Sequence, residues 1–201
     1  MVVDIRPLSA KPDDDREMPT PLHAPEPAAP PIGSSWFWGP ASRVGVLVGA
    51  LTFVADQVNK WWMLAVFDIT SRGRVAVLPF LDLVYVKNQG ISYGLLTQDG
   101  FLGQWVLTGF AVVCCIAMIV WLARADTGRV LAISLGLIIG GALGNALDRA
   151  LAGGVHDFYS LHAFGFYWYV FNIADAAIVA GVLGLLYDSL TASRNGAAKR
   201  A

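Results

Sequence analysis

Apolar residues along the chain are concentrated in four long blocks, at about residues 43–64, 105–123, 130–148 and 168–187. Each block is close to the roughly 20 residues that a helix needs to cross the hydrocarbon core of a bilayer. The second block contains no charged residue. The pattern therefore predicts four transmembrane helices, which would leave both ends of the chain on the same side of the membrane.

The stretch between the first two blocks, about residues 67–103, follows a different pattern. Its centre, RVAVLPFLDLVYVKNQGISYGLL, is rich in Val, Leu, Tyr and Phe and is interrupted by Pro and Gly, which is typical of short β-strands. A small sheet on the membrane surface could hold an extended peptide by strand addition. The predicted fold class is an all-α membrane protein with a small β element, in which four transmembrane helices carry an extracytoplasmic β-cradle.

The two ends of the chain differ from this central part. Residues 1–35 are rich in Pro, Ala and charged residues, so they cannot bury enough apolar surface to offset the chain entropy. We expect a disordered cytoplasmic tail there and not a signal peptide, because no apolar core follows a basic start. Residues 36–190 would form the membrane domain, and residues 191–201 a short second cytoplasmic tail.

The composition of 56% hydrophobic and 14% charged residues is far from that of an ordinary soluble protein. A formal net charge of −1 leaves no basic excess, so we expect no nucleic-acid partner. Lys and Arg residues near the helix ends favour the side of the termini by only six to five, and those of the tail lean the same way. On this basis we place both termini in the cytoplasm. The adjacent Cys114 and Cys115 lie in an apolar run, where we expect packing and neither a disulfide nor a metal site.

Small residues indicate how the helices pack. Gly136, Gly140 and Gly144 repeat every four residues in the third block, and Gly45 and Gly49 do the same in the first. Such spacing places glycines on one helix face and lets two backbones approach closely. We expect these two faces to meet.

Several charged residues interrupt the apolar blocks, where each costs about 2.5 to 3.5 kcal/mol near a helix centre. Asp56 and Lys60 are four residues apart, which is the spacing that lets two side chains pair on one helix face. Asp148 and Arg149 look like a second pair at the outer end of the third block. These residues are expected to neutralise each other.

Asp157 and Asp175 have no matching basic residue in the sequence. Asp157 lies in the connection between the third and fourth blocks, and Asp175 would lie about two turns into the fourth helix, roughly 10 Å below the interface. The two are 175 − 157 = 18 residues apart, so the connection can fold back and bring the carboxylates together. One of two close carboxylates keeps a proton near neutral pH while the other acts as a base on water, which suits peptide hydrolysis.

Gly90, Ser92 and Gly94 also form the pattern G-x-S-x-G, which marks the nucleophile of many serine hydrolases. Such a serine requires the strand, sharp turn and helix of an α/β sheet, and no such sheet can be built from this chain. We therefore interpret NQGISYG, residues 88–94, as a strand and turn that line a cleft, with Asn88 offering hydrogen bonds.

Five short motifs occur in order across the four blocks: DQVNK from Asp56, NQGISYG from Asn88, GGALGNALDR from Gly140, VHDF from Val155 and FNIADA from Phe171. Together they resemble the lipoprotein signal peptidases, also called signal peptidase II. The resemblance covers roughly residues 44–188. It implies a bacterial inner-membrane aspartic endopeptidase, with its active site towards the outer face, that removes signal peptides from diacylglyceryl-modified prolipoproteins just before the lipidated cysteine.

The resemblance also implies roles for particular residues. Asp157 and Asp175 match the catalytic pair, and neither a metal nor a cofactor is expected. The implied partners are prolipoprotein signal peptides and membrane lipids, and we expect a monomer. Eight further residues lie in these motifs at positions that bind substrate or support the pair: Asp56, Lys60, Asn88, Gly90, Asn145, Asp148, Arg149 and Asn172.

One departure from the family pattern is His156, where an aliphatic residue is expected before Asp157. A histidine there could shift the pKa of Asp157 or point to water, and we favour the second. A second possible function is that of a small proton-coupled transporter, which could use Asp56, Asp148 and Asp175 as a relay. A binding protein that only holds lipidated peptides is a third option, against which the presence of both predicted catalytic aspartates argues.

Overall fold

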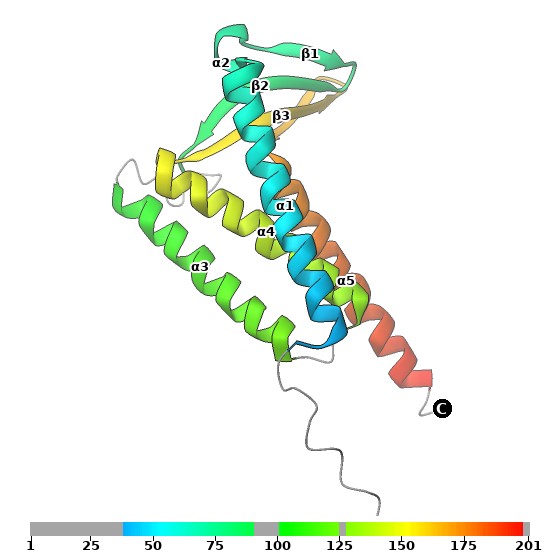
Figure 1. The fold of residues 1–201 in the computed structure, drawn as a ribbon. Helices are drawn as coiled ribbons and strands as arrows, with labels where there is room; N and C mark the ends of the chain where they lie inside the picture. Colours follow the sequence, from blue (N-terminus) through cyan, green and yellow to red (C-terminus); the bar gives the residue numbers. More distant parts are fainter. Residues whose placement is uncertain (1–37, 91–100, 125–127, 199–201) are drawn as a thin grey trace, which may run out of the picture. The chain divides into compact units, whose positions relative to one another are not determined.

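The computed structural model describes residues 38–90, 101–124 and 128–198. Its elements, shown in Figure 1, confirm the predicted fold class of four long apolar helices with a small sheet. The disordered tail predicted for residues 1–35 and the position of Ser92 lie outside the described residues. The helical elements are α1 (Pro40–Trp61), the π-helical turn η1 (Trp62–Val66), α2 (Ile69–Arg72), α3 (Phe101–Arg124), α4 (Arg129–Ala152) and α5 (Ile173–Ala198).

Helix α4 is the central helix, because it packs against α1, α3 and α5, whereas α1 and α3 touch only slightly. The predicted glycine faces do meet. A Cβ atom on Gly136 would collide with the carbonyl oxygen of Gly45, and one on Gly140 would collide with that of Gly49. Only glycine therefore lets the backbones of α1 and α4 come this close.

The strands form one antiparallel sheet in the order β1 (Val75–Leu78), β2 (Leu81–Asn88), β3 (Val155–Ala163) and β4 (Phe166–Phe171). The sheet lies at one end of the helices, opposite the end where α1 begins and α5 finishes (Figure 1). Met63 of η1, Ile69 of α2 and Phe158 of β3 form a fully buried cluster where the segment after α1 meets the sheet.

The start of the fourth helix was predicted wrongly. Residues 168–171, assigned to that helix from their apolar character, belong to strand β4, and α5 begins only at Ile173. Asp175 therefore lies in the first turn of α5 and not two turns inside it. The reason is that β4 pairs with β3, and the pairing of residues distant in the chain leaves no periodic signal in a uniformly aromatic stretch.

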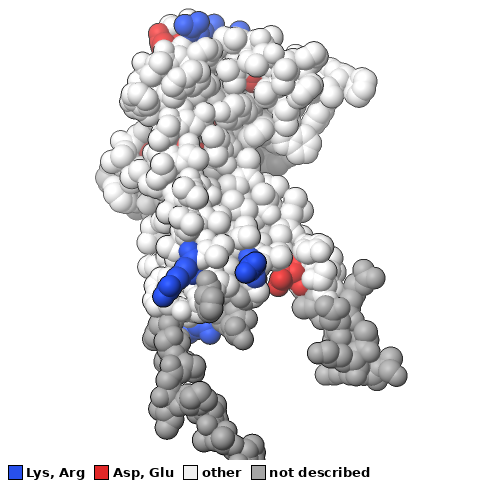
Figure 2. Space-filling view, turned by 45° about the vertical axis from the view of Figure 1, so that its right-hand side comes forward, with Lys and Arg blue, Asp and Glu red and all other residues white. Residues whose placement is uncertain are grey.

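Figure 2 shows the distribution of charge on one face. Lys, Arg, Asp and Glu gather near the two ends of the helices, and a broad band between them is almost free of charge. Such a band is what lipid tails require of the surface that they contact. The surface thus agrees with four helices that are long and apolar enough to cross a membrane.

Candidate active site

Asn172 is the single residue between β4 and α5, and it fixes the start of the helix. Its side-chain Oδ1 accepts a hydrogen bond from the backbone N–H of Asp175 at 2.9 Å, and its own backbone N–H donates to Asp175 Oδ2 at 3.2 Å. This reciprocal pair of bonds is a capping box, in which the first and fourth residues satisfy each other's backbone donors. The FNIADA motif therefore both starts α5 and orients the carboxylate of Asp175.

Asn172 also joins the second carboxylate to the first. Its Nδ2 donates to Oδ1 of Asp157 on β3 at 2.7 Å, and Asn88, at the end of β2, donates to the other oxygen of Asp157 at 3.2 Å. Gly90 N–H donates to Asn88 Oδ1 at 3.2 Å, which holds the amide of Asn88 in place. The two aspartates that lack a partner in the sequence thus belong to one hydrogen-bonded network.

Asp157 is 1% exposed. Burial, followed by the negative charge of Asp175, raises the pKa of Asp157 to about 7, because both effects disfavour a second negative charge at this place. A carboxyl group with this pKa exchanges its proton near neutral pH. It is therefore suited to donate a proton during a reaction.

Asn145 of α4 connects the aspartates to the buried charges of the helices. Its Nδ2 donates to Asp175 Oδ1 at 2.7 Å, and its Oδ1 accepts from Asn172 Nδ2 at 3.1 Å and from Lys60 Nζ at 3.3 Å. Arg149, one turn later, donates from Nη1 to the backbone oxygen of Asn145 at 3.3 Å. Each of these contacts restricts the orientation of Asn145 and so of the aspartate that it binds.

The predicted pair of Asp56 and Lys60 is confirmed, with 2.7 Å between Oδ2 and Nζ. The pairing predicted between Asp148 and Arg149 is wrong. Asp148 lies 2.8 Å from Lys60 Nζ, so one lysine of α1 serves a carboxylate from each of two helices. Neighbours in sequence point to different sides of a helix, which is why sequence alone suggested the wrong partner.

Sequence reasoning missed Gln57, which lies next to Asp56 in the DQVNK motif. Its Nε2 lies within hydrogen-bond distance of Asp56 Oδ2, Asp148 Oδ1 and the backbone oxygen of Gly144, at 3.2 to 3.3 Å. Asp56 in turn accepts a hydrogen bond at 3.0 Å from the backbone N–H of Ala174, in the first turn of α5. The signal that could have found Gln57 is a polar amide at lipid depth beside a buried charge.

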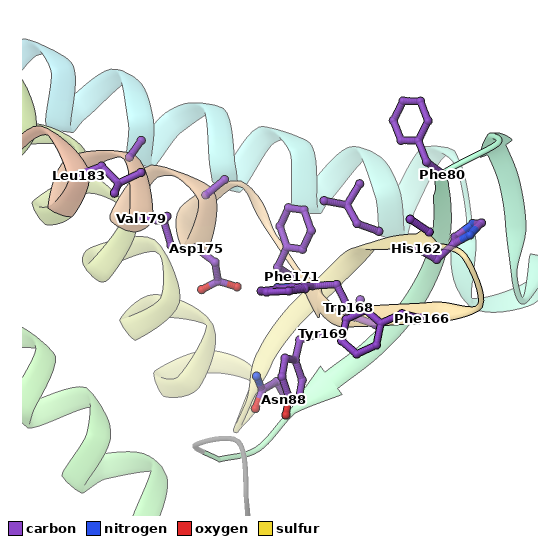
Figure 3. A pocket seen from close by; sticks show the side chains of 15 residues that line it. Phe80, Asn88, His162, Phe166, Trp168, Tyr169, Phe171, Asp175, Val179 and Leu183 are labelled. Carbon is purple, nitrogen blue, oxygen red and sulfur yellow. The ribbon is translucent and has the colours of Figure 1, made fainter.

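An apolar cavity of about 950 Å³ opens beside Asp175 (Figure 3). Asp175 and Asn88 are among its polar lining residues, and aromatic side chains of β4 between Phe166 and Phe171 form a wall. Val179 and Leu183 of α5 extend the cavity along the helix surface. Asp157 is not among the residues that line the cavity, but Asn88, which donates a hydrogen bond to it, does line the cavity.

The prediction that His156 points to water is wrong. Its ring is half-buried and stacks on Tyr85, with 3.0 Å between Nδ1 and the Tyr85 hydroxyl. The backbone N–H of His156 donates to Asp148 Oδ2 at 3.1 Å. Burial lowers the pKa of His156 below its ordinary value, so the ring is neutral at pH 7. Successive residues of a strand point to opposite faces, which keeps this ring away from the carboxylate of Asp157.

Cys114 and Cys115 are free thiols. Among residues 38–90, 101–124 and 128–198, no group of three or more His, Cys, Asp or Glu side chains is placed to hold a metal ion.

The fold and site define a membrane protein in which a small sheet holds an aspartate pair beside an apolar cavity. The family model described as signal peptidase (SPase) II matches residues 48–191. A lipoprotein signal peptidase of Methylocella silvestris is 55% identical over 151 residues, which cover 75% of this chain and 88% of the relative. Another, of Rhodopseudomonas palustris, is 52% identical over 152 residues, with 74% and 92% covered.

A solved structure of a bacterial membrane enzyme has a TM-score of 0.62 and 25% sequence identity, and the match covers 76% of this chain and 91% of that one. The chain therefore belongs to the signal peptidase II family and is a protease. Removal of prolipoprotein signal peptides is the activity that this membership supports, and nothing in the comparisons supports a transporter.

Proposed function

We propose that this chain cleaves prolipoproteins just before the diacylglyceryl-modified cysteine, with Asp157 and Asp175 as its catalytic pair. The observation that carries the proposal is the position of Asn172, which hydrogen-bonds both carboxylates, one of which, Asp175, lines an apolar cavity. Relatives bearing the name lipoprotein signal peptidase support the substrate class. The aspartic mechanism is supported by the geometry of the pair.

In the proposed reaction, Asp175 is the general base. It faces the cavity and accepts hydrogen bonds from Asn145 and from the backbone of Asn172, and the N-terminal end of α5 favours negative charge. Asp175 takes a proton from a water molecule, whose oxygen attacks the carbonyl carbon of the scissile peptide bond. Asp157, whose pKa of about 7 keeps a proton available, donates that proton to the carbonyl oxygen, which gives a tetrahedral gem-diol intermediate. When the C–N bond breaks, Asp175 passes the proton that it took from water to the leaving amine, and Asp157 regains a proton from a hydroxyl group of the intermediate.

The surroundings of the pair suit a lipidated peptide. Among the described strands, β4 is at the edge of the sheet and borders the cavity, a position at which an extended peptide can add to a sheet. The apolar wall of the cavity continues along α5 to Leu183, a surface that can contact the apolar part of a signal peptide or an acyl chain. Asn88, Gly90, Asn145, Arg149 and Asn172 would bind the peptide or orient the pair, while Asp56, Lys60 and Asp148 hold the helices that carry it.

The proposed location is the bacterial inner membrane, with both termini cytoplasmic and the active site towards the outer face. The start of α1 and the end of α5 lie on the side opposite the sheet, in support of a common side for both termini. A monomer is proposed because cavity and aspartate pair are formed by one chain.

The test is cleavage of a purified diacylglyceryl prolipoprotein by the full chain in detergent micelles. Asp157→Asn and Asp175→Asn should each lower kcat by at least about 10³-fold, the size expected for loss of a general acid or base. Asp188→Asn, a change to a carboxylate near the far end of α5, is the matched control and should cleave normally. Ser92→Ala should also cleave normally.

Activity that survived both Asn changes would refute the catalytic assignment, and activity lost only in Ser92→Ala would make the serine the nucleophile. The transporter alternative predicts a different result. Wild-type protein in liposomes would then carry a proton flux that Asp175→Asn abolishes, with no cleavage of the prolipoprotein.

A further inference from the structure

A second charged cluster lies in the sheet, away from the aspartate pair. Asp82 of β2 is 5% exposed, with one carboxylate oxygen 2.7 Å from Arg74 Nη1 and the other 3.3 Å from His162 Nε2 on β3. The Arg74 guanidinium lies over the ring of Tyr167 on β4, 5.2 Å from its centroid, and the rings of His162 and Tyr167 are 4.9 Å apart. The carboxylate of Asp82 on β2 thus contacts His162 of β3 and Arg74 just before β1, and both of these residues contact Tyr167 of β4.

The cluster meets β4 directly beside an irregularity in the strand pairing. Ser160 pairs with Val170, but the next pair is His162 with Tyr167. Leu161 alone on β3 therefore faces two residues of β4, Trp168 and Tyr169, which is a β-bulge. Bulges re-aim side chains and are frequent next to active sites.

The bulge explains the aromatic wall of the cavity. In a regular strand alternate side chains point to opposite faces, so only one of the neighbours Trp168 and Tyr169 would point to the cavity. The extra residue of the bulge lets both line it, together with Phe166 and Phe171 of the same strand. The first regular pair after the bulge is that of His162 and Tyr167. Asp82 contacts His162, and Arg74 lies over the ring of Tyr167. His162 itself lines the cavity, and its backbone N–H donates to Phe80 O at 2.9 Å.

We propose that Asp82, with Arg74 and His162, is a positioning cluster that holds the β4 bulge in register, and that it thereby sets the aromatic wall that binds the apolar side chains of the signal peptide. This inference rests on the proposed function. Asp82 does not touch the reacting atoms, so its loss changes substrate binding and leaves the chemistry of the aspartate pair in place. The hydrogen bond with Arg74 is the main cause that lowers the pKa of Asp82 below its ordinary value, so the carboxylate of Asp82 is ionised at neutral pH.

The experiment measures kcat and KM for a synthetic diacylglyceryl prolipoprotein peptide with the full chain in detergent micelles. Asp82→Asn and Arg74→Gln should each raise KM by about 5- to 10-fold while kcat stays within about 2-fold, the pattern expected when binding is lost without loss of chemistry. Arg72→Gln is the matched control. Arg72 also lies over an aromatic ring, that of Phe67, but neither residue lines the cavity, so KM should not change.

A double-mutant cycle with Trp168→Ala separates positioning from general stability, because residues that act through each other give non-additive effects. Trp168→Ala alone should raise KM. Adding Asp82→Asn to it should raise KM by no more than about a further 2-fold. If Asp82→Asn does not fold, the double variant Trp168→Ala/Arg74→Gln gives the same test of additivity, because the side chain of Arg74 is half-exposed.

Three results would overturn the inference: a fall in kcat with KM unchanged, KM effects that multiply in the double variants, or an equal change in Arg72→Gln. Failure of the proposed function is a separate result, seen as cleavage by Asp157→Asn. The cycle uses whatever cleavage the chain performs, so it can succeed or fail independently of the catalytic assignment.

Discussion

Lys60 of α1 and Asp148 of α4 form an ion pair with 2.8 Å between Nζ and Oδ2, and both side chains are almost completely buried. The same ammonium group contacts Asp56 and Asn145. One positive charge therefore faces two carboxylates at lipid depth. The first prediction concerns the loss of this charge.

Lys60→Met should destabilise the protein by about 3 to 5 kcal/mol, because it leaves two buried carboxylates without a cation. Unfolding in mixed detergent micelles, followed by circular dichroism, measures the change. The double variant Lys60→Met/Asp148→Asn should recover part of the loss, since it removes one unpaired charge. Wild-type stability of the single variant would show that the pair contributes nothing.

The activity should have an alkaline limit set by Asp157. As the general acid it must carry its proton, and its pKa is about 7, so kcat/KM should fall as the pH rises through about 7. Asn88→Ala removes a hydrogen bond that lowers this pKa, so its remaining activity should persist to higher pH. A limit that moved to lower pH in Asn88→Ala would contradict the assignment of the acid.

Stability should follow the same group. The pKa of Asp157 in the folded protein lies above its ordinary value of 3.8, so between these pH values the folded state binds more protons than the unfolded state. The contribution of Asp157 to the free energy of unfolding is therefore complete below about pH 4, and it is lost as the pH rises to about 7. Asp157→Asn cannot titrate, and its Tm should fall less than that of the wild type between about pH 4 and about pH 8. Parallel Tm curves would refute this origin.

The glycine contact between α1 and α4 should tolerate no added methyl group. Gly140→Ala would place a Cβ against the backbone oxygen of Gly49 and 2.7 Å from Thr52 Cβ, and overpacking of this kind costs about 1 to 3 kcal/mol. Gly109→Ala on α3 is the control, because its Cβ would meet nothing within 4 Å. Equal unfolding midpoints for the two variants would show that the helices separate without cost.

The departure at His156 should matter little for catalysis. Its ring contacts Tyr85 and does not contact Asp157. Tyr85→Phe and His156→Val should therefore leave kcat within about 3-fold and should not move the alkaline limit set by Asp157. A shift of that limit in His156→Val would show that the ring acts on the carboxyl group.

The sequence was sufficient for features with a local signal. Four apolar blocks predicted the spans, the four-residue spacing of Asp56 and Lys60 predicted their contact, and glycine spacing predicted the close approach of two helices. The strands β3 and β4 were missed, because they are defined by pairing with distant residues and by a bulge. The same limit explains why the partner of Asp148 was predicted wrongly. That partner is Lys60, which lies 88 residues earlier in the chain (148 − 60 = 88), and not the adjacent Arg149.

For the candidate site, the approach of the two aspartates could be predicted from the sequence, but the role of Asn172 could not. That Asp157 and Asp175 would come together followed from the absence of a basic partner and from the length of the connection. The role of Asn172 as both helix cap and bridge could not be read in the same way, since it depends on β4 ending one residue before α5 begins. A capping pattern N-x-x-D was present, but the apolar stretch before it hid the helix start.

The sharing of Lys60 has a consequence for the order of events during synthesis. The α1 segment leaves the ribosome 88 residues before Asp148, which at about 5 to 20 residues per second is roughly 4 to 18 seconds. During that interval α1 has no α4 to supply a counter-charge. Asp56, one helical turn away at 2.7 Å, can neutralise Lys60 within the newly made helix, so α1 enters the bilayer with a counter-charge of its own, and Asp148 joins this pair when α4 arrives.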